Sequence, residues 1–378
     1  MNNYDIAAFV WPSYTNDDPR ARMFWREGMG EWQSVKNAQE NSADYKPDWY
    51  KSWKGRKPLW GYVNEANPDV MQMQIDCAVR HGVNVFIYDW YWYDGRPFLE
   101  NCLNDGFLKA PNSDKMKFYL MWANHNVNEC WNIDRSDDNQ NDGNIIWNGS
   151  VSPDEYKKLI DRWIDKYFKL PNYYKIDGKP VFLIYDPRNF INSFGGNLAA
   201  AREALDYFRE KAIEAGFPGL HLQITSWNVA VQNYSGVDGE PCDVSSIYKT
   251  LGFDSATNYQ WVHFQHPGDY LEMTERAKEE YENITKRGMC YFPHVSIGWD
   301  NNPRFKKFRP GIVTGNTPQA FEGALRVAKE YVDTHELPAN LITVNSWNEW
   351  TETSYLEPDE LYGYGYLEAI KKVFTENN

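Results

Sequence analysis

The sequence predicts an α/β fold of the (β/α)8, or TIM-barrel, type, and three observations carry this prediction. The chain has 378 residues, which suits one large α/β domain with insertions or two ordinary domains. Eight short apolar runs are spaced along it, and segments with helical periodicity lie between them. No internal repeat or low-complexity linker divides the chain, so we expect a single catalytic domain over residues 1–378.

The eight runs are rich in β-branched and aromatic residues, and most are continuously apolar. Strands that are buried on both faces of a parallel sheet have this pattern. An open doubly wound sheet is the competing architecture, but no Gly-x-Gly-x-x-Gly follows the first run, so we prefer the barrel. The expected strands cover residues 5–10, 83–88, 117–122, 180–185, 220–225, 253–259, 290–297 and 341–345.

Helix signals lie between the expected strands. Ser152 and Pro153 fit an N-cap and first turn, Thr317 opens a second helix, and Gly82 ends a third. Further helices are expected over residues 198–215, 270–287 and 360–374, with a weaker signal over 243–251.

Two connections, residues 12–67 and 126–151, are too long to be simple loops. They follow the first and third strands, so both lie on the strand-to-helix side, which is the active face of a barrel. We therefore expect both to be lids or binding loops.

Composition and charge exclude several kinds of partner. The formal net charge of −14 disfavours nucleic acid and anionic membrane surfaces, and no run approaches the roughly 20 apolar residues of a membrane span. Five cysteines without a Cys-x-x-Cys favour neither a disulfide framework nor a zinc ribbon, and we expect no metal and no bound cofactor. The first residues show no export signal, which leaves the location open: periplasmic or secreted if a signal peptide was removed, and cytoplasmic otherwise. Nothing in the sequence indicates an oligomeric state.

Aromatic and polar residues gather at the expected carboxyl ends of the strands. Nine of the 17 tryptophans lie within a few residues of these ends, accompanied by Asn, Asp, His and Glu. Packing at the barrel top is the alternative for any one ring. Because sugars stack their C–H faces on rings while their hydroxyls need donors and acceptors, the combination favours a carbohydrate substrate. The expected substrate-binding residues are Trp11, Tyr88, Asp89, Trp90, Trp92, Trp122, Asn124, His125, Tyr185, Trp227, His294, Trp299, Asn345, Trp347, Asn348, Trp350 and Tyr355.

The candidate catalytic residues are Glu349 and Glu352, which follow the last expected strand. Residues three apart share one side of a helical turn, and two carboxyl groups beside aromatic rings can differ in pKa, one acting as acid and one as base. Glycoside cleavage needs such a pair. A solvated helix face is the alternative for this spacing, and the flanking Trp347 and Trp350 favour the catalytic interpretation.

The block Asn345-Ser346-Trp347-Asn348-Glu349-Trp350-Thr351-Glu352, followed by Tyr355-Leu356-Glu357-Pro358, resembles the Asn-Glu-Trp-x-Glu segment of family 99 glycoside hydrolases. It is more similar still to WbsX-type proteins, a group with a family-99-like domain. Residues 88–92, 122–124 and 252–254 agree, so the resemblance covers nearly the whole chain.

The resemblance implies a (β/α)8 glycosidase that acts on α-linked sugars with retention of configuration. By that analogy Glu349 takes a proton from the sugar's own 2-hydroxyl, a 1,2-anhydro sugar forms, and Glu352 is the general acid/base. Two departures are visible: Thr351 and Thr353 flank Glu352 where family 99 has His and Gly, and His125 stands where WbsX-type proteins usually carry Glu.

Three functions therefore remain open. The first is a retaining glycoside hydrolase acting on a poly- or oligosaccharide, with α-mannose-like sugars as one substrate class. The second is a glycosyltransferase of surface polysaccharide synthesis, although no Asp-x-Asp is present to hold a nucleotide-sugar metal. The third is a catalytically silent barrel that binds glycans.

Overall fold

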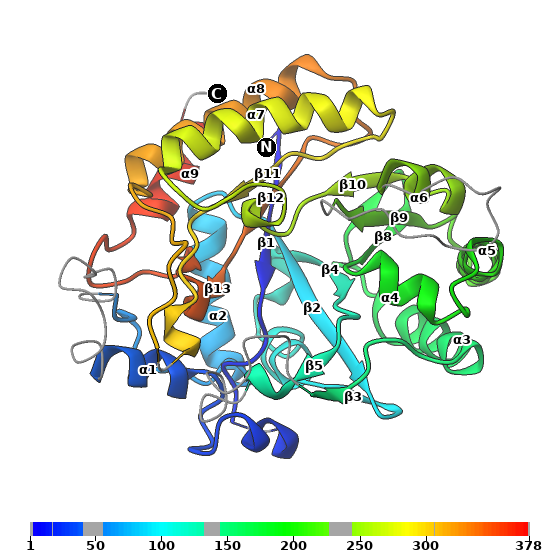
Figure 1. Cartoon of the computed structure of the whole chain (residues 1–378), viewed down its shortest axis with the longest axis horizontal. Helices are drawn as coiled ribbons and strands as arrows, with labels where there is room; N and C mark the ends of the chain where they lie inside the picture. Colours follow the sequence, from blue (N-terminus) through cyan, green and yellow to red (C-terminus); the bar gives the residue numbers. More distant parts are fainter. Residues whose placement is uncertain are drawn as a thin grey trace.

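The structure, a computed structural model, describes residues 3–16, 18–40, 56–131, 144–226, 244–305 and 307–376. Eight parallel strands form a nearly closed barrel, which confirms the predicted fold class (Figure 1). The barrel strands are β1 (Asp5–Val10), β2 (Val85–Tyr93), β4 (Lys117–Trp122), β8 (Lys179–Ile184), β9 (His221–Thr225), β10 (Ser255–Thr257), β11 (His294–Ser296) and β12 (Leu341–Asn345).

The hydrogen-bonded order of these strands is β10-β9-β8-β4-β2-β1-β12-β11. The interval between β10 and β11 is spanned by one parallel bridge: the Ala256 N–H donates to Cys290 O (2.8 Å), and the Phe292 N–H donates to Ala256 O (2.9 Å). All eight expected strands are found, with β2 extending five residues beyond its expected end at Tyr88.

Helices surround the barrel, and Figure 1 shows α7 and α8 side by side across one side of it. The capping signals are confirmed: the Ser152 hydroxyl accepts the Glu155 N–H (3.2 Å), and the Thr317 hydroxyl accepts the Ala320 N–H (3.3 Å). The helices are α1 (Trp32–Glu40), α2 (Pro68–Arg80), α3 (Pro153–Trp163), α4 (Pro187–Asn192), α5 (Leu198–Glu214), α6 (Val244–Leu251), α7 (Tyr270–Lys286), α8 (Pro318–Thr334) and α9 (Gly365–Phe374).

One crossover differs from the regular alternation. Between β2 and β4 the described chain forms a single π-helical segment, η2 (Cys102–Phe107), in place of an α-helix. A second π-helical segment, η5 (Ile164–Phe168), continues α3. Short 3-10 turns are η1 (Pro19–Met23), η3 (Ser113–Lys115), η4 (Glu129–Trp131), η6 (Trp261–His263), η7 (Asn302–Arg304) and η8 (Trp350–Glu352).

Short additional strands form small pairs outside the eight-stranded barrel order. The minor strands are β3 (Arg96–Phe98), β5 (Val127–Asn128), β6 (Ile145–Trp147), β7 (Lys175–Ile176), β13 (Asn348–Glu349) and β14 (Ser354–Tyr355). The antiparallel pair β13–β14 pairs Glu349 with Ser354 and thereby fixes the chain around the expected catalytic residues. Within the described ranges, no helix has the length and apolar character that crossing a membrane requires.

Candidate active site

A cavity of about 340 Å³ opens at the carboxyl ends of the barrel strands. Its walls include Asp89 and Tyr91 of β2, His125 after β4, and Tyr185 after β8. The two long connections also contribute, through residues such as Glu31 of the first and Trp131 of the second. Side chains from several strands and both long loops therefore meet at the face where barrel enzymes do their chemistry.

Glu349 and Glu352 both line this cavity, as predicted. Glu349 ends β13, and Glu352 ends the 3-10 turn η8 that follows it. Both are buried, with exposed fractions of 2% and 9%. The Oε2 atom of Glu352 is buried and has no hydrogen-bond partner among the residues that the structure describes.

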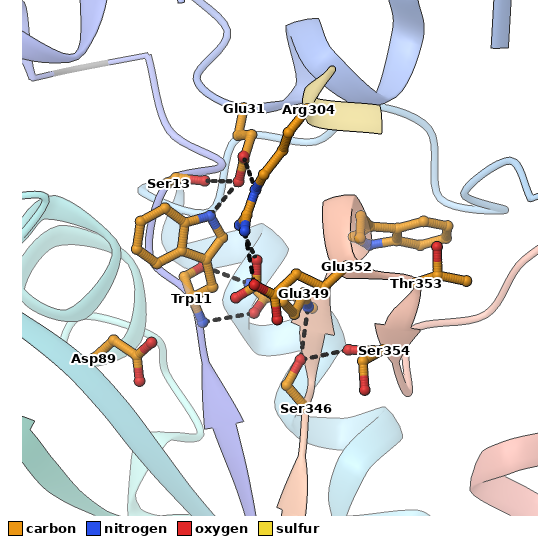
Figure 2. A network of polar contacts seen from close by, with 12 residues as sticks. Trp11, Ser13, Glu31, Asp89, Arg304, Ser346, Glu349, Glu352, Thr353 and Ser354 are labelled. Carbon is orange, nitrogen blue, oxygen red and sulfur yellow. Dashed lines mark hydrogen bonds and ion pairs between the residues drawn. The ribbon is translucent and has the colours of Figure 1, made fainter. Parts of the chain in front are cut away.

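Arg304 joins the two carboxyl groups (Figure 2). Its Nη2 donates to Glu349 Oε1 at 2.6 Å, and its Nη1 donates to Glu352 Oε1 at 2.7 Å. Short, charge-assisted bonds of this kind set both the position and the charge of the carboxyl groups. A single guanidinium therefore fixes how the pair faces the cavity.

A third carboxyl group, that of Glu31, completes the network in Figure 2. Arg304 Nε donates to Glu31 Oε1 at 3.1 Å, and the Trp11 indole N–H donates to the other oxygen. The preceding Gly30 has φ +60°, and a Cβ there would lie 1.8 Å from Ser13 O. Only glycine fits this turn, which sets Glu31 against the cavity.

Backbone and hydroxyl contacts hold the chain on both sides of Glu349. Its N–H donates to the Ser346 hydroxyl (2.7 Å), which donates to Ser354 O (2.7 Å). Beyond Glu352, Thr353 adopts a left-handed conformation (φ 57°), and its hydroxyl donates to Asp300 O (2.9 Å). The segment from Glu349 to Glu352 is thus held by contacts on both of its sides.

The electrostatics of the pair suit acid/base chemistry. Burial, followed by repulsion from Glu352, raises the pKa of Glu349 well above its usual range, while Arg304 opposes the rise. Burial also raises the pKa of Glu352, and Arg304 again opposes it. Burial and mutual repulsion therefore both disfavour two negative charges in the pair.

Aromatic rings form another part of the cavity wall. The His125 ring lies against Tyr91 (5.6 Å between centroids), Tyr185 (5.5 Å) and Trp131 (5.6 Å), and Trp131 also contacts Trp11 (5.3 Å). Burial lowers the pKa of His125. Its Nδ1 lies 3.1 Å from Asn126 O, so the neutral ring donates from Nδ1 and leaves Nε2 as the acceptor.

Four of the expected substrate-binding residues line the cavity: Trp11, Asp89, His125 and Tyr185. Several others do not, and strand geometry explains why. Successive side chains of a strand point to opposite faces, so Asp89 and Tyr91 face the barrel interior while their neighbours face the helices. The outward residues are Tyr88, which packs on Phe107 and Phe118; Trp90, which packs on Trp163; Trp92, which donates to Glu155; and Trp122, which packs on Tyr156 and Trp163.

The aromatic residues of the last motif also lie away from the cavity. Trp347 donates its indole N–H to Gln74 (3.1 Å) and packs on Phe86. Trp350 donates to Glu357 (2.6 Å) and stacks on Tyr355 with ring centroids 3.7 Å apart. These three rings are not among the residues that line the cavity, and they pack behind the segment that carries Glu349 and Glu352. This corrects the expectation that they bind substrate.

The remaining expected residues that the structure describes make contacts inside the protein and do not face the cavity. The Asn124 side-chain amide pairs with the backbone of Asp186, and the Asn348 amide pairs with the backbone of Trp11. Asn345 accepts from Gln260 (3.1 Å), His294 bonds Thr343 (2.9 Å) inside the barrel, and Trp299 packs on the core. None of the five lines the cavity, and Trp227 lies outside the described residues.

The sequence prediction missed several residues that line the cavity: Trp25, Glu31, Tyr91, Trp131, Tyr259 and Arg304. Strict alternation counted forward from Asp89 identifies Tyr91. Glu31, Trp131 and Arg304 come from connections whose conformation no local pattern specifies. Among the described residues, no group of three or more His, Cys, Asp and Glu side chains is arranged to hold a metal ion.

The chain therefore has the architecture of a (β/α)8 barrel with a cavity of acidic and aromatic residues at the carboxyl ends of its strands. The family model described as Glycosyltransferase WbsX matches residues 6–370, so the chain belongs to the WbsX family. It is 25% identical over 386 residues to the uncharacterized protein WxcX of Xanthomonas campestris pv. campestris. That alignment covers 98% of this chain and 49% of WxcX, so the chain spans about half the length of this relative.

Solved structures agree on the fold. The GH99 endo-alpha-mannosidase from Bacteroides thetaiotaomicron matches with a TM-score of 0.61 at 14% identity, covering 99% of this chain and 97% of that one. A glycoside hydrolase-like protein matches with a TM-score of 0.62, also at 14% identity, covering 99% and 94%. At this identity the likeness shows a shared fold.

Proposed function

We propose that this chain is a retaining glycoside hydrolase that cleaves α-linked sugars in an oligo- or polysaccharide. One observation carries the proposal: Glu349 and Glu352 face the same cavity at the active end of the barrel, tied to a single guanidinium. The structural likeness to an endo-alpha-mannosidase supports mannose-like sugars as the substrate class.

The chemistry proceeds through the sugar's own 2-hydroxyl. The Glu349 carboxylate takes the proton of that hydroxyl, the oxygen attacks C1, and the C1–O bond to the leaving group breaks as Glu352 gives its proton to the leaving oxygen. Water, activated by the Glu352 carboxylate, then attacks C1 and opens the 1,2-anhydro ring, and Glu349 returns its proton to the 2-oxygen. Two inversions give net retention, and attack from the rear requires a 2-hydroxyl trans to the leaving group, as in α-mannosides.

Arg304 has a defined part in this scheme. It bonds one oxygen of each glutamate, which leaves Glu352 Oε2 unpartnered for the leaving-group oxygen. Its charge also stabilises Glu349 as the carboxylate that the first step needs. Arg304 is therefore a positioning residue that acts through both catalytic groups.

A glycosyltransferase is the second candidate, because the WbsX family is described by that activity. The charges around the cavity favour the hydrolase. Both arginines that line it are engaged with carboxyl groups: Arg304 with the glutamates, and Arg188 with Asp186 at 3.2 Å. A nucleotide diphosphate would meet Glu31, Asp89 and Asp186 with neither guanidinium free to bind it.

The deciding experiment incubates the protein with α-linked oligosaccharides and polysaccharides and, in parallel, with nucleotide sugars plus glycan acceptors. We expect hydrolysis products by chromatography, and NMR of the first product should show the α-anomer. Substrates whose 2-hydroxyl is methylated should remain intact, since the first step needs that proton. Transfer from a nucleotide sugar without hydrolysis would establish the second candidate, and binding of glycans without turnover would establish a silent barrel.

No step above uses a metal ion. We therefore expect that dialysis against a chelator leaves the hydrolysis rate within about twofold of the untreated rate. A loss that added divalent metal restores would contradict the scheme.

A further inference from the structure

Asp89 is one of five acidic side chains that line the cavity, and it lacks the cation that the other four have. It lies on the inner face of β2 and is 4% exposed. Its Oδ2 is 3.0 Å from the Tyr259 hydroxyl, while its Oδ1 is buried and has no hydrogen-bond partner in the described ranges. Glu31, Glu349 and Glu352 share Arg304, and Asp186 pairs with Arg188. Within the described parts of the chain, no basic side chain pairs with Asp89.

Tyr259 lies between Asp89 and the catalytic base. Its hydroxyl is 3.0 Å from Asp89 Oδ2 and 3.3 Å from Glu349 Oε2. Burial raises the pKa of Tyr259 well above its usual range, so the hydroxyl keeps its one hydrogen. The hydroxyl can donate its one hydrogen to only one of the two carboxyl groups. Its contact with the other carboxyl group is therefore favourable only when that group is protonated and donates to the tyrosine oxygen.

The two carboxyl groups differ in how well each tolerates charge. The Glu349 carboxyl group has the Arg304 guanidinium at 2.6 Å. Among the described residues, the Asp89 carboxyl group has only the Tyr259 hydroxyl, and its Oδ1 has no hydrogen-bond partner. A buried carboxylate oxygen without a donor is costly, whereas the carbonyl oxygen of a neutral acid is much less so. The proton therefore belongs on Asp89.

We propose that Asp89 is held as a neutral acid whose Oδ2–H donates to Tyr259, which in turn donates to Glu349 and keeps Glu349 ionised as the base. In this arrangement the hydrogen on Asp89 makes the contact with Tyr259, and the hydrogen on Tyr259 makes the contact with Glu349. It also removes the Asp89 charge, which would otherwise be among the contributions that raise the pKa of Glu349. Asp89 is a positioning residue that acts through Tyr259.

The surroundings of Asp89 agree with this assignment. Burial raises the pKa of Asp89 well above its usual range, the Tyr259 hydrogen bond opposes the rise, and the charge of Glu352 adds to it. The ionisable groups that face Asp89 and Glu349 are Glu31, Glu352 and Arg304, together with the tyrosines Tyr14, Tyr91, Tyr185 and Tyr259.

The role of Glu349 as base rests on the proposed function, so the first test requires no activity. In protein labelled with ¹³C at the aspartate carboxyl carbon, Asp89→Asn identifies the Asp89 resonance by its disappearance. We expect that resonance at the position of a protonated acid from pH 5 to pH 8. A resonance at the carboxylate position, or one that titrates below pH 5, would overturn the proposal whether or not the protein hydrolyses glycans.

The second test uses the pH profile of kcat/KM on whichever α-linked oligosaccharide is hydrolysed. Asparagine keeps an N–H donor where Asp89 Oδ2 lies, so Asp89→Asn should lose less than about tenfold, whereas Asp89→Leu should lose about 100-fold or more. Asp89→Leu removes the group that donates to Tyr259, and Tyr259→Phe removes the group that donates to Glu349. Either loss makes the Glu349 carboxylate less stable, so both variants should move the acidic limb of the pH profile to higher pH.

Thermal unfolding of each variant separates this effect from a folding defect. An Asp89→Asn loss as large as that of Asp89→Leu would show that Asp89 works as a carboxylate and would refute the inference. An acidic limb that does not move in Asp89→Leu and Tyr259→Phe would refute it equally.

Discussion

The inner and outer faces of the barrel strands carry similar residue types but differ in what those residues contact. On β2, Asp89 and Tyr91 face the cavity, whereas Trp90 and Trp92 face the helix layer. The outward indoles have polar partners: Trp90 donates to Glu100 and Trp92 donates to Glu155, both at 2.7 Å. Polar residues beside aromatic rings therefore do not by themselves distinguish a sugar site from a packed helix interface.

The same division holds after β12. Glu352 faces the cavity, while five residues later Glu357 lies behind the segment and accepts from Trp350. Both side chains are buried, and burial raises the pKa of both. The two side chains differ in that Glu352 lines the cavity and contacts Arg304, whereas Glu357 is not among the residues that line the cavity. The comparison of the two faces thus makes predictions that pairs of matched variants can test.

The largest expected difference is between Glu352→Gln and Glu357→Gln. Removing the proton donor at the cavity should lower kcat by about 10²–10⁴-fold, whereas the Glu357 change behind the segment should lower it by less than about tenfold. Steady-state kinetics on one substrate measure both, and circular dichroism checks that both variants fold. Equal losses in the two variants would mean that the division into faces does not predict function.

A smaller difference is expected between two half-buried tryptophans, Trp131 at the cavity and Trp92 on the outer face. Trp131→Ala removes a ring that contacts Trp11 and His125, and about 1 kcal/mol of lost stacking should raise KM by about fivefold to tenfold. Trp92→Ala removes the bond to Glu155 and the stacking on Trp90, so it should lower the melting temperature while KM stays within about twofold. The reverse pattern would place the sugar on the helix side.

The sequence predicted the fold well because the signals for it are local. Continuous apolar runs and capping residues specify each strand and helix where they stand, and β1, β4 and β12 begin and end at the expected residues. The position of Glu349 and Glu352 at the cavity was also predictable, since the two residues are close in sequence and directly follow a strand.

The rest of the site depends on contacts between distant parts of the chain. Arg304 is 45 residues from Glu349, and Glu31 is 273 residues from Arg304, so no window of sequence relates them. The direction of each tryptophan depends on strand phase, which a one-residue uncertainty in register reverses. Asp89 is the instructive case: alternation from it would have placed Tyr91 inside and Trp90 outside.

The smallest expected effect concerns a second acidic pair, Glu65 and Glu357, which lies behind the catalytic segment. Gln74 Nε2 donates to Glu65 Oε1 (3.2 Å) and to Glu357 Oε1 (2.7 Å), and Asn348 donates to Glu65. Burial raises the pKa of Glu65 from 4.5 to about 7, with hydrogen bonds from Asn348 and Gln74 opposing the rise. The folded state therefore holds a proton that the unfolded chain releases at a lower pH.

This pKa difference makes the stability of the protein depend on pH. The contribution of Glu65 is fully present below about pH 4.5 and is lost as the pH rises through about 7, with a slope of at most about 1.4 kcal/mol per pH unit in between. Glu65→Gln should flatten the fall in the free energy of unfolding between pH 5 and pH 7, measured by urea denaturation. Glu336→Gln, at an exposed site, makes the same charge change and should leave the slope as it is. If the free energy of unfolding has the same pH slope in both variants, the pair of Glu65 and Glu357 ionises as freely as surface acids do. The acidic groups behind Glu349 would then be charged.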